Sequence, residues 1–96
     1  MTTQSEQPST SKDLTIENRN GLHARPAALF VKTSSRFRSE VWVEKDGEKV
    51  NGKSIMGLMM LAAGKGSVLK VTAEGDDASL LMQELEHLIS TRFGEE

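Results

Sequence analysis

The sequence predicts one α+β domain in which three helices cover one face of a four-stranded, mainly antiparallel sheet. Four short segments are rich in β-branched residues or alternate apolar with polar residues, which is typical of half-buried strands. Three others carry apolar residues three or four positions apart, which is typical of helices with one buried face. Their order is βαββαβα, and 96 residues allow one modest core. A single sheet with helices on one face and water on the other is the natural layered arrangement for this order.

The chain is expected to begin with a tail. Residues 1–11 contain no apolar residue after Met1 and are rich in Ser, Thr and Gln. Such a segment cannot offset the entropy lost on ordering by burying apolar surface. We therefore expect residues 1–11 to be disordered and residues 12–96 to form the domain.

The first strand and the first helix are separated by a short turn. Leu14 and Ile16 alternate with polar residues, and Gly21 ends the turn because glycine adopts positive φ without a steric penalty. A helix is expected to begin near His23, since Pro26 then falls in the first turn, where its missing N–H has no helical partner to lose. The buried face of this helix is expected to contain Ala27, Phe30 and Val31.

A hairpin is predicted in the middle of the chain. Val41 and Val43 share one face of a β-rich segment, so Trp42 should point to the open side of the sheet. There Trp42 either covers cross-strand neighbours or offers an additional contact surface. The Asp-Gly pair at positions 46–47 is a strong signal for a two-residue turn, after which the chain returns as a strand ending near Val50.

A short helix, a strand and a long helix follow. Ser54 is a good N-cap for a helix reaching about Leu61, and a glycine-rich turn at residues 64–66 precedes the next strand. One face of that strand is expected to hold Val68, Val71 and Ala73, with Leu69 on the other face. The last helix is the clearest element, because one stripe contains Ala78, Leu81, Met82, Leu85, Leu88 and Ile89.

The candidate chemistry lies where the first helix begins. A helix N-terminus has unpaired amides and a partial positive charge, and both favour a bound anion. A phosphoryl group on the imidazole of His23 would lie among the backbone amides of Ala24 and Arg25, and the Arg25 guanidinium suits phosphate oxygens. Imidazole is also a usable nucleophile near neutral pH. The alternative interpretation is that His23 is a polar capping residue and Arg25 is a solvated surface charge.

The helix over residues 54–61 is apolar nearly all round. A short helix at the edge of a small domain cannot bury every side, and Leu58, Leu61 and Ala62 make one core stripe, which leaves methionines outside. Methionine recurs on surfaces that meet several partners, so this helix predicts a docking surface near His23. The alternative is a well-buried helix.

Composition opposes several other classes of protein. Cysteine is absent, so there is no disulfide or thiolate chemistry, and a formal charge of −2 with few aromatic residues opposes an RNA-binding domain of similar element order. His87, the only other histidine, is interpreted as a solvated helix residue, so no metal site is expected. We find no paired carboxylates, phosphate-binding loop or nucleophile–base pair that would indicate a self-standing enzyme. No segment resembles a secretory signal or a membrane span, and we expect the protein in the cytoplasm.

Three blocks of the sequence resemble the HPr family, the histidine-containing phosphocarriers of the bacterial phosphoenolpyruvate-dependent sugar phosphotransferase system. The active-site motif of that family is similar to residues 20–28 (NGLHARPAA), and its regulatory serine region is similar to residues 50–59 (VNGKSIMGLM). The turn that follows is similar to residues 64–67 (GKGS), and the blocks come in the right order and at the right separations. The resemblance implies an open-faced β-sandwich of four antiparallel strands and three helices, in agreement with the order of elements derived above.

The resemblance also implies roles for individual residues. His23 would be phosphorylated on Nδ1 by enzyme I, itself charged by phosphoenolpyruvate, and would pass the group to an enzyme IIA domain, while Arg25 would steady the phosphoryl group. The partner-docking face would contain Ala24, Ala28, Ile55, Met56 and Met59. No cofactor is implied, and we expect a monomer.

Ser54 has two interpretations. In similar proteins of some bacteria an ATP-dependent kinase, HPr kinase/phosphorylase, phosphorylates this serine, and the added charge hinders docking to enzyme I. The alternative is that Ser54 is only a helix cap. Two further hypotheses about the whole protein stay open: a nitrogen-related or regulatory HPr-like protein that retains phosphotransfer, and a non-carrier protein-binding module of the same fold.

Overall fold

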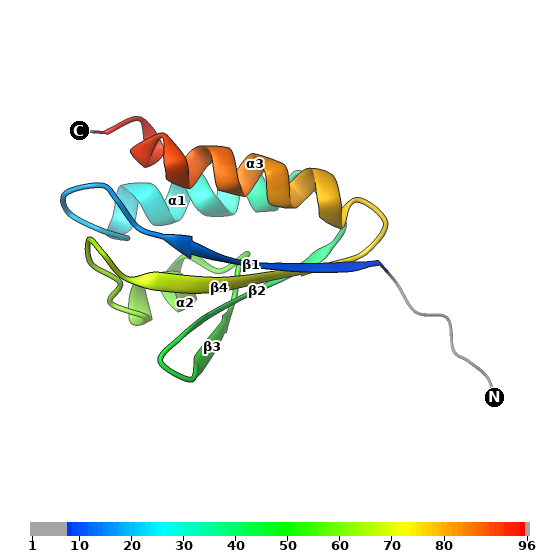
Figure 1. Ribbon diagram of the computed structural model, residues 1–96, viewed down its shortest axis with the longest axis horizontal. Helices are drawn as coiled ribbons and strands as arrows, with labels where there is room; N and C mark the ends of the chain where they lie inside the picture. Colours follow the sequence, from blue (N-terminus) through cyan, green and yellow to red (C-terminus); the bar gives the residue numbers. More distant parts are fainter. Residues whose placement is uncertain (1–7, 96) are drawn as a thin grey trace.

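The predicted elements occur in the predicted order in the computed structural model, which describes residues 8–95 (Figure 1). The strands are β1 (Ser9–Thr15), β2 (Glu40–Lys45), β3 (Glu48–Asn51) and β4 (Val68–Glu74). The helices are α1 (Ala24–Ser34), α2 (Ile55–Met60) and α3 (Ala78–Ser90), and a short 3₁₀ turn, η1 (Arg92–Gly94), follows α3. Within this part of the chain, none of the helices has both the length and the apolar character needed to cross a membrane.

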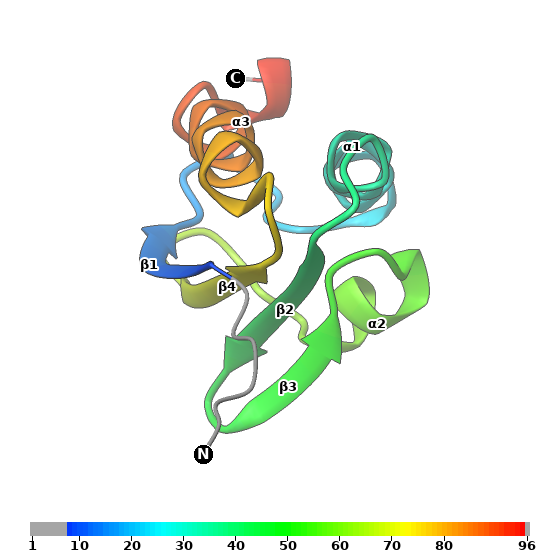
Figure 2. The ribbon, with the colours of Figure 1, turned by 90° about the vertical axis from the view of Figure 1, so that its right-hand side faces the viewer.

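The four strands form one antiparallel sheet in the order β1-β4-β2-β3. Figure 2 shows the three helices on the same side of this sheet, which confirms the fold class predicted from the sequence. Leu14 lies opposite Leu69 in the register, and Val43 lies opposite Val71. All four of these side chains are buried, so the core lies between the sheet and the helices.

The two faces of β4 differ from our expectation. Leu69, Val71 and Ala73 are buried, whereas Val68 is 52% exposed. The prediction that Val68 shares a face with Val71 and Ala73, with Leu69 on the other face, was wrong. Side chains alternate along a strand, so Leu69 shares the buried face with Val71 and Ala73, and Val68 points to the opposite face. Val68 lies on the open face of the sheet, opposite Thr15.

β1 begins earlier than the apolar pattern suggests. We expected a disordered tail over residues 1–11; residues 1–7 lie outside the described residues, but residues 9–11 pair with the end of β4. The hydroxyl oxygens of Ser11 and Thr72 are 3.0 Å apart across this pair of strands. Because the backbone ladder and not burial holds these polar residues, no hydrophobic alternation marks them in the sequence.

α1 and α3 bury the faces expected of them. Ala27 and Phe30 of α1 are fully buried, and Val31 packs against the core. The buried residues of α3 are Ala78, Leu81, Met82, Leu85 and Ile89, with Leu88 partly buried beside them. Near the end of α1, the Ser34 hydroxyl donates a hydrogen bond of 2.8 Å to the Gly52 carbonyl oxygen and so ties α1 to the loop before α2.

α2 begins as predicted, but its buried stripe ends at Leu61, one residue before the predicted end at Ala62. Ser54 is the N-cap, and its Oγ accepts a hydrogen bond of 3.0 Å from the N–H of Gly57. Leu58 and Leu61 are buried, but the prediction that Ala62 belongs to the core stripe was wrong. Ala62 has a φ of 51°, which takes the chain off the helical path and buries Ala63 instead.

The hairpin between β2 and β3 has the predicted turn. Asp46 and Gly47 both have positive φ, 52° and 84°, as a type I′ turn requires. Trp42 lies on the open face of the sheet, between buried neighbours that point the other way. The ammonium nitrogen of Lys49 lies 5.5 Å from the centroid of the Trp42 ring, so the ring is covered by a cross-strand neighbour.

Asp77 fixes the connection between β4 and α3 to the start of β2. Its carboxylate accepts hydrogen bonds of 3.0 Å from the backbone N–H groups of Arg38 and Ser39, and another from the Ser39 hydroxyl. These bonds lower the pKa of Asp77 below its usual value of 3.8. The bond from the Ser39 hydroxyl is the largest cause, and the bond from the Arg38 N–H is the second. Gly75 lies so close to Ser39 that a Cβ at position 75 would overlap it.

We expect the free energy of unfolding to fall in acid partly because of Asp77. The pKa of Asp77 is lower in the folded protein than in the unfolded chain. Its contribution to the free energy of unfolding is therefore fully present above the pKa of the unfolded chain, and it is lost as the pH falls through the pKa of the folded protein. Urea unfolding from neutral to strongly acidic pH should show a weaker acid dependence for Asp77→Ala than for the wild type. Asp76→Ala, which removes an exposed neighbouring carboxylate, is the control, and an acid dependence of Asp77→Ala equal to that of the wild type would contradict this account.

Candidate functional site

His23 is the N-cap residue of α1, immediately before the first helical residue. Its backbone is extended, with φ −85° and ψ −168°, and its carbonyl oxygen accepts a hydrogen bond of 2.9 Å from the N–H of Ala27. Its side chain makes no capping hydrogen bond and is 41% exposed. His23 therefore occupies the capping position, as the alternative interpretation has it, but its side chain makes no capping bond, and the imidazole is available for other contacts.

The first turn of α1 presents two backbone amides beside His23. These amides belong to Ala24 and Arg25, because Pro26 carries no N–H and the amide of Ala27 is bonded to the His23 carbonyl. Ala24 and Arg25 are exposed, and no ion pair within residues 8–95 involves the Arg25 guanidinium. This end of α1 therefore offers an anion two N–H donors, the positive end of the helix dipole and an exposed guanidinium.

The loop before α1 is held against the connection between α2 and β4. Leu22 is buried, and its N–H donates a hydrogen bond of 2.8 Å to the Ala63 carbonyl oxygen. Gly21 has a φ of +72°, and a Cβ at this position would lie 2.4 Å from that same oxygen. Glycine is therefore required here for both its conformation and its size, and the contact fixes where His23 lies relative to α2.

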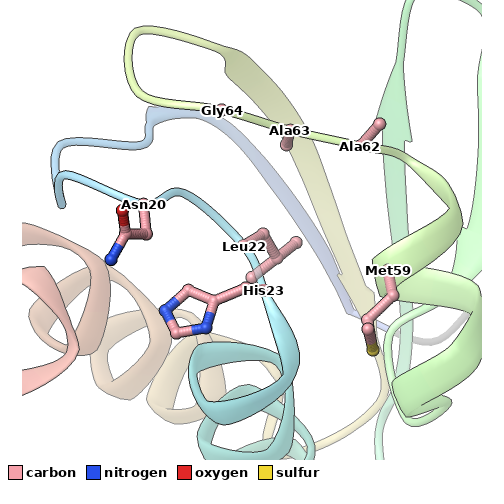
Figure 3. A pocket seen from close by; sticks show the side chains of 7 residues that line it. All are labelled: Asn20, Leu22, His23, Met59, Ala62, Ala63 and Gly64. Atoms are coloured by element: carbon pink, nitrogen blue, oxygen red, sulfur yellow. The ribbon is translucent and has the colours of Figure 1, made fainter.

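An open hollow of about 260 Å³ lies beside the His23 ring (Figure 3). It is lined by Asn20, Leu22, His23, Met59, Ala62, Ala63 and Gly64. Residues 20–23 form one side and residues 59–64 form the other, so the hollow joins the start of α1 to the end of α2. Most of these side chains are apolar, which suits contact with an apolar group of a partner.

The outer side of α2 is apolar and exposed. Ile55, Met56, Met59 and Met60, which we call the α2 surface, are 41%, 73%, 43% and 66% exposed. Since Leu58 is the buried residue of α2, the alternative of a well-buried helix is wrong. The other large exposed apolar side chains among the described residues, Val68 and Leu80, belong to β4 and α3. α2 packs beside α1, where the predicted docking residues Ala24 and Ala28 are also exposed.

Ser54 lies where α2 begins, next to the α2 surface. Its hydroxyl is half-buried and accepts the capping hydrogen bond from Gly57. The interpretation of Ser54 as a helix cap is therefore confirmed, and its role as a modification site stays a prediction. Its neighbour Lys53 donates a hydrogen bond of 2.9 Å from Nζ to the Phe37 carbonyl oxygen, which holds this loop near the end of α1.

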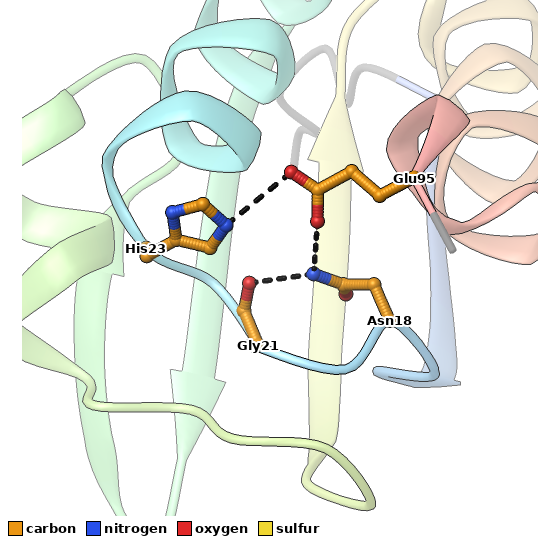
Figure 4. Close-up of polar contacts among 4 residues, drawn as sticks. All are labelled: Asn18, Gly21, His23 and Glu95. Atoms are coloured by element: carbon orange, nitrogen blue, oxygen red, sulfur yellow. Dashed lines mark hydrogen bonds and ion pairs between the residues drawn. The ribbon is translucent and has the colours of Figure 1, made fainter.

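Two residues that the sequence analysis did not single out complete the site (Figure 4). Glu95 Oε2 lies 3.3 Å from His23 Nε2, and Glu95 Oε1 accepts a hydrogen bond of 3.0 Å from Asn18 Nδ2. Asn18 Nδ2 also donates a bond of 2.7 Å to the Gly21 carbonyl oxygen. Figure 4 shows the other ring nitrogen, Nδ1, turned away from Glu95. No local pattern marks Glu95 in the sequence, because its position depends on a reversal of the chain after α3.

Comparison with known proteins gives consistent matches. A family model described as "PTS HPr component phosphorylation site" matches residues 10–91. The phosphocarrier protein HPr of Neisseria meningitidis is 51% identical over 84 residues, which cover 88% of this chain and 94% of that protein. The HPr-like protein Crh of Halalkalibacterium halodurans is 53% identical over 74 residues, which cover 77% of this chain and 88% of that protein.

Solved structures agree with these matches. A crystal structure of HPr from Thermoanaerobacter tengcongensis has a TM-score of 0.88 and 54% identity, and the match covers 91% of this chain and 98% of that one. HPr of the same organism has also been solved as a dimer, with a TM-score of 0.73, 57% identity and coverage of 88% and 99%. The chain therefore belongs to the HPr family, the phosphocarrier proteins of the phosphotransferase system.

Proposed function

We propose that the chain accepts a phosphoryl group on His23 from phosphoenolpyruvate, through enzyme I, and passes it to enzyme IIA-type proteins for sugar uptake or regulation. The observation that supports this most is the position of the His23 ring at the amino end of α1. The ring makes no capping bond, is 41% exposed and belongs to the residue that directly precedes Ala24 and Arg25 at the start of the helix. Membership of the HPr family supports the same chemistry.

The site can stabilise a phosphoryl group without enclosing it. When Nδ1 of His23 carries the group, the two amides, the helix dipole and Arg25 offset the charge on its oxygens. The hollow beside the ring is open, so a partner can reach the group and supply most of the stabilisation of the transition state. An open site suits a carrier, since a site that bound the group much more tightly would slow its release.

The docking face that we propose contains Ala24, Ala28, Ile55, Met56 and Met59, all of which are exposed. Enzyme I and enzyme IIA proteins would have to reach the same histidine, so one surface must fit partners of different shape. Methionine side chains are flexible and polarizable, which allows such adaptation. Repeated transfer also favours a small interface and a short-lived complex.

We also propose that Ser54 is a regulatory phosphorylation site for an HPr kinase/phosphorylase. A phosphate on the N-cap of α2 is compatible with the helix dipole, so the modification need not unfold the helix. It would place about two negative charges next to Ile55 and Met56, where an apolar partner surface would otherwise dock. Docking to enzyme I would therefore weaken while the fold persists.

Two alternatives differ in partners rather than in fold. The first alternative is a nitrogen-related or regulatory HPr-like protein, which retains phosphotransfer but controls proteins and does not feed sugar uptake; the similarity to an HPr-like protein, Crh, is compatible with it. A binding module that carries no phosphate is the second. We propose a cytoplasmic monomer because one copy contains all the site residues, and the dimer solved for the Thermoanaerobacter protein makes a dimer the alternative.

Incubation with phosphoenolpyruvate, magnesium and a bacterial enzyme I should add one phosphoryl group to the wild type. Intact-protein mass spectrometry measures the addition, which should be stable in alkali and lost in acid. His23→Ala should gain nothing, whereas His87→Ala, the matched control at the other histidine, should behave like the wild type. No addition to the wild type, with an enzyme I that charges a control carrier, would favour a private partner or a non-carrier module, and an addition to His23→Ala would identify a different site.

The α2 surface can be tested with a charge placed in its centre. Met56→Glu should lower kcat/KM for phosphorylation by enzyme I about tenfold or more, as expected when one well-packed interface contact is lost. Leu80→Glu on α3 is the matched control, because Leu80 is 54% exposed but lies outside the proposed face. Equal kcat/KM values for Met56→Glu and the control would show that α2 is not the docking element.

Ser54→Ala separates the two roles of this serine. Loss of the capping bond should lower the free energy of unfolding by about 1 kcal/mol, measured by urea unfolding. HPr kinase/phosphorylase with ATP should add one phosphate to the wild type and to the control Ser79→Ala, but none to Ser54→Ala. The phosphorylated wild type should then accept phosphate from enzyme I more slowly, and an unchanged rate would leave Ser54 as a cap alone.

A further inference from the structure

We propose that the exposed methionines of α2 are an oxidation site, at which a peroxide converts Met56, Met59 and Met60 to sulfoxides and so weakens the docking of partners on the α2 surface. The inference rests on the proposed function, since it adds a form of regulation to the same docking face. It begins from the exposure of these three residues, which is 73%, 43% and 66%.

The sulfur atoms of this protein are unequally accessible to an oxidant. Cysteine is absent from the chain, so no thiolate competes for a peroxide. Among the described residues, the methionine outside α2 is Met82 of α3, which is only 2% exposed. Because the susceptibility of a sulfur to oxidation follows its exposure, a peroxide that reaches the folded domain should react first with the α2 methionines.

The three methionines lie on one side of α2. Met59 and Met60 follow Met56 by three and four positions, a spacing that places side chains on the same face of a helix. Leu58, the buried residue of α2, points to the core instead. Met59 also lines the hollow beside the His23 ring (Figure 3). Oxidation would therefore change one continuous surface, which reaches from the outer side of α2 to the edge of that hollow.

Each oxidation is a two-electron step that consumes one molecule of peroxide. A lone pair of the methionine sulfur forms a bond to one peroxide oxygen, and the O–O bond breaks with its electron pair left on the other oxygen. The proton of the transferred oxygen passes to the departing hydroxide, which leaves as water. The sulfur is oxidised and the peroxide is reduced, so the side chain becomes a sulfoxide that carries one added oxygen atom.

A sulfoxide suits solvent and opposes an apolar interface. The thioether is apolar and flexible, whereas the sulfoxide is polar and accepts hydrogen bonds. In the free protein, water can bond to the new oxygen atoms because all three side chains are exposed. When a partner covers α2, those oxygens lose water and meet an apolar surface, and burying a polar group without a hydrogen bond is unfavourable. Oxidation should therefore weaken binding without changing the residue that carries the phosphoryl group.

The fold should persist through the modification. Buried Leu58 and Leu61 hold α2 to the core, and the Ser54 hydroxyl caps its amino end, so none of these contacts needs a methionine sulfur. The exposed sulfoxides also stay accessible to methionine sulfoxide reductases. With a dithiol as reductant, the oxygen leaves as water, the thioether returns and the dithiol becomes a disulfide. The change is therefore reversible in the folded protein.

The test begins with the order in which the methionines are oxidised. The wild type is treated with hydrogen peroxide at neutral pH, and peptide mass spectrometry follows the sulfoxide at each position. Met56, Met59 and Met60 should be oxidised several-fold faster than Met82, while circular dichroism stays that of the untreated protein. Oxidation of Met82 at the same rate would overturn the proposal. This measurement uses no phosphoryl donor, so its result is independent of the proposed function.

Enzyme I kinetics complete the test, with enzyme I added only after catalase has removed the peroxide. Oxidation of the wild type should lower kcat/KM about fivefold or more, mainly through a higher KM for the carrier, because a polar oxygen is then buried in the interface. The sulfoxide reductases with a dithiol should restore the starting value. An unchanged kcat/KM for the oxidised wild type would overturn the proposal.

Two variants assign the effect to α2, each compared with its own untreated form. The triple substitution Met56→Leu, Met59→Leu and Met60→Leu removes the thioethers, so peroxide should leave its kcat/KM unchanged. Met82→Leu is the matched control, which keeps the α2 methionines and should lose as much as the wild type. An equal loss in the triple variant would overturn the proposal. Failure of the untreated wild type to accept phosphate would refute the proposed function instead.

Discussion

The place where α1 begins depends on one hydrogen bond, from the Leu22 N–H to the Ala63 carbonyl oxygen. It joins the loop after β1 to the connection between α2 and β4, and Gly21 allows it because no Cβ fits against that oxygen. Through this bond, the amino end of α1 and the exposed side of α2 become neighbours. This contact helps to bring together the candidate nucleophile, its two amides and the apolar surface beside it, and hydrogen bonds between Ile16 and residues 66–67 join the same two segments nearby.

The stability of the domain and the exposure of α2 are linked. Leu58 and Leu61 anchor α2 to the core, while the Ser54 cap and the Ser34–Gly52 hydrogen bond hold its amino end. With these contacts in place, the four apolar side chains of the α2 surface can stay exposed. Exposed Met side chains on a short helix lower solubility. The helix can still present them because other contacts hold it against the core.

The spacing of apolar residues predicted most of the fold, but it did not predict the reversal of the chain after α3. Apolar spacing located α1, α3 and the hairpin, and the block around His23 located the amino end of α1. The pattern failed where burial does not decide the structure, as in Ser9 to Ser11, which are held by backbone pairing with β4. It misassigned Val68 because apolar character was given more weight than strict alternation. Glu95 was not predictable, since its contact needs consecutive left-handed residues and a burial of Phe93 that no local pattern encodes.

The single tryptophan has a practical consequence for this protein. Trp42 lies on the open face of the sheet with Lys49 over its ring, whereas the α2 surface lies on the side covered by helices. Its fluorescence should report on the integrity of the β2–β3 and β2–β4 pairs and remain nearly silent when a partner covers α2. Trp42 fluorescence therefore reports on folding, and the sheet separates this signal from changes at His23.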